Sequence, residues 1–236
     1  YDGKMDEIMI FNKSLSHSQI QDIYNRQINR FKESGKQEFK PFSINEGNTN
    51  FSIKTNFDKI VGANLTGKVG QINDSLDSAK DDQILYMPFE WNQSWDLSGE
   101  GNDGTINGDT IWNGGGGLNG TGAYDFDGST DYISLGELPI DGWHHLSVCA
   151  WVNTGGRTSF SSDEAIIGAW EENQFLVWGD AGNNKWQGTV GDGTNTIEVN
   201  TGTITPNGGW EHVCMVLDSN DLQMYVDGQD GGSDTG

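Results

Sequence analysis

The segment Met5-Asp6-Glu7-Ile8-Met9-Ile10-Phe11 is almost entirely apolar after its two acidic residues. In a β-strand, Ile8 and Ile10 point to one face of the sheet. Met9 and Phe11 then point to the other face, so both faces are apolar. A strand of this kind is buried on both sides. We therefore predict that residues 5–11 form an inner strand of a β-sandwich.

A short helix is predicted directly after this strand. Ser16 and Gln19 have the spacing of a capping box. Leu15 precedes the cap and can pack against Ile20 as a hydrophobic staple. Apolar residues recur at helical spacing at Ile20, Ile23, Tyr24, Ile28 and Phe31. Residues 1–31 are thus predicted to be a strand followed by a docked helix.

The rest of the chain divides at about residue 82. Residues 32–81 are polar, lack tryptophan and alternate in part, which predicts a β-rich connector. Residues 82–236 contain all nine tryptophans and many strand-like runs that are separated by Gly, Asn and Asp. We predict strands at 84–89, 122–126, 132–135, 145–152, 164–170, 174–178, 185–190, 210–217 and 222–226. Short strands without interleaved helices indicate an all-β fold, an antiparallel β-sandwich or jelly roll.

The formal net charge of -22 is unevenly distributed. Residues 1–80 hold 11 Lys and Arg against 10 Asp and Glu, whereas residues 81–236 hold 2 against 25. A body this acidic repels phosphate groups and anionic lipid, so we expect neither nucleic acid nor a membrane surface as a partner. It suits calcium, high salt or a cationic partner, or it serves solubility alone. No run approaches the roughly 20 apolar residues of a membrane span, so no membrane insertion is expected.

An extracellular or cell-surface location is expected from six Asn-x-Ser/Thr sequons, which are candidate glycosylation sites. They begin at Asn12, Asn50, Asn64, Asn73, Asn92 and Asn119. The chain opens on Tyr1 without a signal peptide, so we expect a processed or excised piece. The two cysteines, Cys149 and Cys214, lie in predicted buried strands. They form either a disulfide between neighbouring strands or two buried thiols.

Several motifs in this order resemble laminin-G-like jelly-roll domains of the concanavalin-A-like kind. They are the runs 85–90 and 96–105, then 124–128 with 131–133, 147–152, 210–216 and 224–228. The family normally ends with a Gly-x-Asp-Glu-hydrophobic strand and a short helix. Residues 82–236 stop without that ending, and residues 2–25 resemble it. The resemblance therefore covers both ends of the chain in permuted order.

A sandwich without an inner strand exposes backbone hydrogen-bonding groups and an apolar groove. Burying each apolar side chain of the 5–11 strand contributes roughly 1.5–3 kcal/mol, so that strand is expected to fill such a groove. It can close the preceding domain of a tandem array, another subunit, or its own chain. We favour the first two arrangements. They predict a non-catalytic surface, adhesion or filament protein that binds neighbouring copies or repeats head to tail.

The resemblance also implies sites. A structural calcium ion would lie where opening and closing strands meet, and the alternative is turn formation by the same residues. Its candidate ligands are Glu90, Asp96, Asn102, Asp103 and Asp6, with a second group of Asp125, Asp127 and Asp131. Carbohydrate binding would use exposed indoles, with Trp170, Trp178 and Trp186 as candidates; the alternative is that they fill the core.

No enzyme is predicted. Glucanases that share this fold carry Glu-x-Asp-x-(x)-Glu along one strand, and the chain has no such triplet. Its adjacent acidic pairs, 163–164 and 171–172, would point to opposite faces of a strand. The alternative to the assembly role is a calcium-dependent carbohydrate-binding module.

Overall fold

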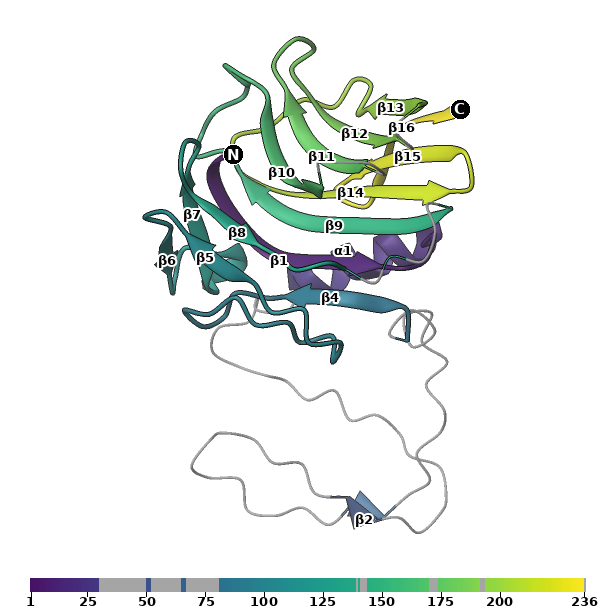
Figure 1. Ribbon diagram of the computed structural model, residues 1–236. Coiled ribbons are helices and arrows are strands. Elements are labelled where there is room, and N and C mark those ends of the chain that lie inside the picture. The colour runs from purple at the N-terminus through teal and green to yellow at the C-terminus, as the bar shows by residue number, and fades with distance from the viewer. Residues whose placement is uncertain are drawn as a thin grey trace. The chain divides into compact units, whose positions relative to one another are not determined.

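The computed structural model describes residues 1–29, 50–51, 65–66, 81–138, 140, 144–169, 174–191 and 194–235. The chain forms two units, one of residues 1–32 with 75–236 and one of residues 33–74. In the smaller unit, β2 (Asn50–Phe51) and β3 (Leu65–Thr66) form an antiparallel pair. The larger unit is an antiparallel β-sandwich with one α-helix, which confirms the predicted fold class (Figure 1).

The first main sheet of the sandwich has eight strands. Its order is β16-β15-β14-β9-β1-β7-β6, and β4 also pairs with β1. The strands are β1 (Asp2–Phe11), β4 (Gln83–Met87), β6 (Ile111–Asn113), β7 (Ala123–Asp127), β9 (His145–Asn153), β14 (Trp210–Asp218), β15 (Asp221–Val226) and β16 (Gln229–Thr235). Nearly continuous burial along β9 and β14 shows that the centre of this sheet is covered on both faces.

The second main sheet has the order β10-β11-β12-β13. Its strands are β10 (Glu164–Ala169), β11 (Gln174–Asp180), β12 (Lys185–Gly191) and β13 (Thr196–Asn200). It lies over the β15-β14 half of the larger sheet (Figure 1). A separate pair, β5 (Thr105–Asn107) with β8 (Tyr132–Ser134), and a 3-10 turn, η1 (Leu118–Gly120), complete the described unit. The apolar core lies between the sheets.

β1 lies in the middle of the larger sheet and pairs along both of its edges. Its residues 2–5 pair with β7 and its residues 8–11 with β4, while β9 occupies the opposite edge. Ile8 and Ile10 are buried in the core, at 7% and 0% exposure. A bulge interrupts the pairing with β9 between Asp6 and Met9, where Glu7 has a φ of 51°. The predicted inner strand is therefore confirmed.

The helix α1 (His17–Asn29) covers the outer face of the same sheet. Its N-terminus is a capping box: Ser16 N donates to Gln19 Oε1 at 2.9 Å, and Gln19 N donates to Ser16 Oγ at 3.3 Å. Ile20 and Ile23 are buried against a cluster of apolar residues from β1, β9, β14 and β15. Burial of one helical face, rather than intrinsic helix propensity, stabilises a helix of this length.

The structure shows the closing strand within the sandwich of its own chain. This is one of the three arrangements considered from the sequence, and not one of the two that were favoured. The strand-deficient body of residues 82–236 thus has its inner strand supplied from the N-terminus, in the permuted order that the motifs indicated.

Candidate functional site

We call residues 1–29, which comprise β1 and α1, the closing segment. Two of its basic side chains contact carboxylates of the sandwich. Lys4 Nζ lies 3.8 Å from Asp125 Oδ2 on β7, and Lys13 Nζ lies 3.0 Å from Asp82 Oδ2, just before β4. Opposite charges at both ends of the strand favour its insertion in one register.

Arg157 holds the first residues of β1. Its guanidinium pairs with both carboxylate oxygens of Glu164 and also donates to the carbonyl oxygen of Asp2. The backbone N–H of Asp2 donates to Glu164 Oε2 at 3.2 Å. Burial favours the neutral form of Glu164, but the hydrogen bonds from the Arg157 side chain and from the backbone of Asp2 lower its pKa. One of only two basic residues in 81–236 therefore serves to anchor the closing segment.

Asp6 is a fully buried carboxyl group in the middle of β1. Its Oδ1 accepts from Glu7 N at 2.8 Å, and its Oδ2 accepts from Leu118 N at 3.0 Å and Thr121 Oγ1 at 2.9 Å. Gly117 permits this approach, because a Cβ there would lie 2.7 Å from Asp6 Oδ2. The loop of residues 117–122 is thus built to receive the side chain of Asp6.

Asp6 belongs to a group of neighbouring acids. Burial, followed by the charge of Glu7, raises the pKa of Asp6 to about 8, and Glu90 adds to the increase. The hydrogen bonds from Leu118 and Thr121 act in the opposite direction but do not offset burial. A cation at this position would relieve the repulsion between the carboxylates.

Glu7 connects the sheet to the helix. Its Oε2 accepts from Gln27 Nε2 at 3.0 Å and from Tyr86 OH at 2.8 Å. Gln27 Oε1 in turn accepts from Trp151 Nε1 at 2.9 Å. This network joins α1, β1, β4 and β9, so the helix is held by directed hydrogen bonds as well as by apolar packing.

A family model described as the concanavalin A-like lectin/glucanases superfamily, of the laminin-G-like kind, matches residues 127–236. Residues 127–236 are therefore similar to a laminin-G-like domain. The match runs from the end of β7 to the C-terminus, and the structure adds β1 and β4 to the same sheet. No curated protein and no solved structure matches the chain. This match supports, at most, a module for carbohydrate binding or adhesion. Laminin-G-like domains are typically non-catalytic and extracellular. No helix in the described part of the chain has the length and apolar character that crossing a membrane requires.

The expected calcium ligands of the first group lie in two different environments. Asp96 accepts four hydrogen bonds, two at each oxygen, from Tyr86 N, Ser98 N, Ser98 Oγ and Asn102 N at 2.8–2.9 Å. Burial alone would raise its pKa, but these donors lower it. All four acceptor positions of the carboxylate are used, so Asp96 does not fit a calcium ligand. Asp6 and Glu90 interact electrostatically, because the charge of Glu90 adds to the raised pKa of Asp6.

The other two residues of the first group also take part in this loop. Asn102 Nδ2 donates to the carbonyl oxygen of Ile84 at 2.6 Å, and Asp103 Oδ1 accepts from Asp96 N at 2.7 Å. Both interactions shape the turn after β4. They correspond to the turn-forming alternative.

The second group of acids likewise organises a turn. Asp127 Oδ1 accepts from the backbone N–H groups of Ser129, Thr130 and Asp131, and these bonds lower the pKa of Asp127. Asp131 accepts from Asp127 N, while Asp125 lies beside Lys4. The arrangement shapes the connection from β7 to β8 without pointing the three carboxylates to one centre.

The tryptophans proposed for sugar stacking do not form one exposed platform. Trp186 has 0% exposure and packs edge-on against Phe160, with 4.8 Å between ring centroids, so its assignment to a binding surface was wrong. Trp178 is half-buried and donates from Nε1 to Thr189 Oγ1 at 3.1 Å. Trp170 lies outside the described residues.

The structure instead exposes two tryptophans that the sequence analysis did not single out. Trp91 is 54% exposed and Trp95 50%, and their ring centroids are 6.4 Å apart. Both belong to the loop that is held by Asp96. The sequence could have indicated this exposure, because three polar residues separate the two indoles in Trp91-Asn92-Gln93-Ser94-Trp95.

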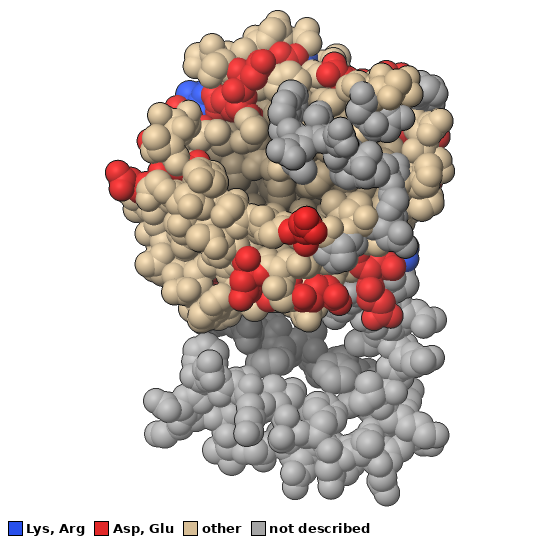
Figure 2. Space-filling model, in the orientation of Figure 1, with Lys and Arg blue, Asp and Glu red and all other residues tan. Residues whose placement is uncertain are grey.

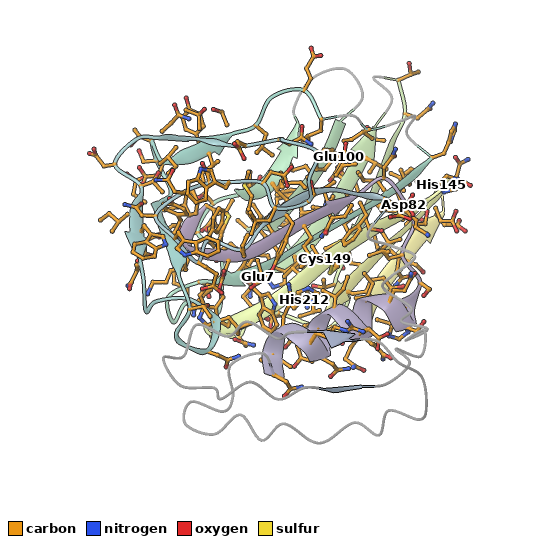
Figure 3. All side chains as sticks on the ribbon, turned by 90° about the horizontal axis from the view of Figure 1, so that it is seen from below. Glu7, Asp82, Glu100, His145, Cys149 and His212 are labelled. Carbon is orange, nitrogen blue, oxygen red and sulfur yellow. A yellow bond between two sulfur atoms is a disulfide. The ribbon has the colours of Figure 1, made fainter. Side chains whose placement is uncertain are left out.

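Cys149 and Cys214 are joined by a disulfide between the paired strands β9 and β14, with 4.2 Å between their Cα atoms. His212 lies beside them beneath α1 (Figure 3). Burial lowers the pKa of this histidine to about 3, so it is neutral. Among the described residues, these three form the one cluster of at least three His, Cys, Asp or Glu side chains whose ligand atoms lie close together, but its sulfur atoms are bonded to each other.

The sequon asparagines have different settings. Asn92 and Asn119 are exposed, and Asn12 is half-buried. Asn119 Nδ2 donates to the carbonyl oxygen of Ile28 at 2.9 Å. Asn50 lies on β2, whereas Asn64 and Asn73 lie outside the described residues.

Proposed function

We propose that this chain is a non-catalytic, extracellular adhesion or surface-assembly module whose closing segment can complete the sandwich of a neighbouring copy or repeat. The observation that supports the proposal is the position of β1, which is N-terminal in sequence yet central in the sheet and paired along both edges. Residues 30–80 separate the end of α1 from the rest of the sandwich. The closing segment is thus joined to its body through a separate stretch of sequence, and it can make the same contacts in its own body or in another.

Concentration decides between the two outcomes. A linked segment has an effective concentration for its own body that does not depend on dilution, so an isolated dilute chain closes on itself. When copies are held side by side on a surface, or linked in tandem, the local concentration of neighbouring bodies becomes comparable to the effective concentration of the segment's own body. Because the contact joins two different surfaces, exchange propagates head to tail into an open filament.

A zero-length cross-link between Lys13 and Asp82 would report which body the segment occupies, because their side chains are 3.0 Å apart. We would mix chains labelled with ¹⁴N and ¹⁵N, concentrate them, cross-link with a carbodiimide and analyse the peptides by mass spectrometry. Mixed-isotope cross-links support exchange. The Lys13→Gln variant is the control that should lack the cross-link. Assemblies that contain only single-isotope cross-links would contradict the proposal.

A second candidate is a calcium-dependent carbohydrate-binding module, which the exposed pair Trp91 and Trp95 favours. Indole faces stack on the CH groups of sugar rings, and the Asp96 loop keeps the two rings in place. Asp6 and Glu90 would hold the ion, near the end of β4 that leads into this loop. Glycan arrays with and without EDTA test both parts. Trp91→Ala should abolish binding and Trp178→Ala should not; binding that survives Trp91→Ala would exclude this surface.

A further inference from the structure

An apolar cleft of about 1160 Å³ opens between the two main sheets. Its floor is the inner face of the larger sheet, where Met5 and Ile8 of β1 lie beside Leu85 and Met87 of β4. Residues 165–168 of β10 form one wall, and residues 132–138, from β8 onward, form the other. Figure 2 shows the hollow on the face that carries these elements. The cleft is separate from the groove that β1 fills, because β1 is part of its floor.

Both walls of the cleft contain an edge strand. In the described part of the chain, β10 pairs with β11 and β8 pairs with β5, each along one edge. Residues of both strands, 165–168 of β10 and 132–134 of β8, line the cleft. Backbone N–H and C=O groups along such an edge can accept another strand.

The charge around the cleft selects the kind of strand. Asp131 and Glu137 are among its lining residues. Residues 81–236 carry 25 acidic against 2 basic side chains. Acidic side chains spread over the face shown in Figure 2, with few basic ones. An occupant with lysine or arginine on its outer face is therefore favoured over an anionic one.

We propose that this cleft binds an extended peptide strand of a partner protein, with alternate apolar side chains on one face and lysine or arginine on the other. The strand pairs with the edge of β10 that has no partner among the described strands, inserts its apolar side chains over Met5 and Ile8, and presents its cations to the acidic rim. This is β-strand addition, in which the backbone supplies affinity and alternate side chains supply specificity. A small apolar molecule would fill the volume but leave the edges of β8 and β10 without backbone partners.

Two labelled peptides of identical composition test the proposal by fluorescence anisotropy with the full chain. One alternates, Lys-Val-Lys-Ile-Lys-Val-Lys; the other is blocked, Lys-Lys-Lys-Lys-Val-Ile-Val. The alternating peptide should bind at least about tenfold more tightly, because only it presents an apolar face. Ala165→Trp fills the β10 side of the cleft without changing the charge, and it should weaken binding by about tenfold or more. Ala165 is exposed, so the variant should fold.

Thr196→Trp is the matched control, since it places the same bulk at an exposed position on β13 of the same sheet. It should bind like the wild type. Equal binding of the two peptides would assign the effect to charge and overturn the proposal. Unchanged binding by Ala165→Trp would also overturn it, as would a small apolar dye that occupies the cleft while neither peptide competes with it.

Discussion

Replacing Asp6 by asparagine should remove a specific dependence of stability on pH. Burial raises the pKa of Asp6 from 3.8 to about 8 in the folded chain. A folded state that holds a proton more tightly than the unfolded state is favoured at low pH, and that advantage is lost as pH rises through the folded pKa. Each pH unit within the window from 3.8 to 8 therefore costs about 1.4 kcal/mol of unfolding free energy.

Two other buried titratable groups determine the pH range in which the stabilities should be compared. Burial lowers the pKa of His212 from 6.5 to about 3, so this histidine makes stability rise with pH, but only below 6.5. Burial raises the pKa of Glu211 from 4.5 to about 7, and this effect is common to wild type and variant. From pH 6.5 to 8, the difference between the two proteins thus reports Asp6. Allowing for its partial titration near pH 8, that difference amounts to about 1.5–2 kcal/mol.

The assay is equilibrium urea unfolding at several pH values from 6.5 to 8 in EDTA, followed by tryptophan fluorescence. Wild type should lose about 1.5–2 kcal/mol more than Asp6→Asn over this range. Asp127→Asn, at an exposed turn, is the control that should follow the wild-type curve. Parallel curves for wild type and Asp6→Asn would refute the reasoning. If calcium binds Asp6, adding it should keep the carboxyl ionised and flatten the wild-type curve.

Three further predictions concern the closing segment and the disulfide. Ile10→Ala should lower the free energy of unfolding by about 2–5 kcal/mol in urea titrations, because Ile10 is fully buried; a loss well below 1 kcal/mol would contradict its place in the core. Arg157→Gln should cost about 1–3 kcal/mol and increase amide exchange at residues 2–5, since Glu164 loses its charged partner; unchanged exchange would argue against the anchor. Reducing the Cys149–Cys214 bond should lower stability by about 2–5 kcal/mol, and identical melting curves with and without reductant would show that no bond had formed.

Much of the fold could be predicted because the chain marks its strands by composition. Each of the nine predicted strands coincides with an observed strand to within about two residues. Within residues 81–236, the strands that were not predicted are β5, β6, β13 and β16. β5 and β6 have three residues each, and β16 contains Gly231 and Gly232 without one apolar residue, so their pairing depends on neighbouring strands rather than on their own preference.

The candidate site was harder to predict, because a side chain's type does not reveal its surroundings. Trp186 has the same indole as Trp91, yet stacking of the two sheets buries one and a loop exposes the other. Asp96 looked like a metal ligand, but the turn around it supplies four hydrogen-bond donors instead. Only the folded chain shows which acids meet each other and which meet backbone N–H groups.

The position of β1 also has a consequence for synthesis on the ribosome. β1 emerges before the strands that flank it in the sheet, since its partner β9 ends at Asn153 and β14 at Asp218. At about 5–20 residues per second, roughly 10–40 s of translation separate Phe11 from the end of β14. Throughout that interval, a strand that is apolar on both faces has no finished sheet in its own sandwich to enter. The nascent chain must therefore keep β1 from associating prematurely until β14 has been synthesised.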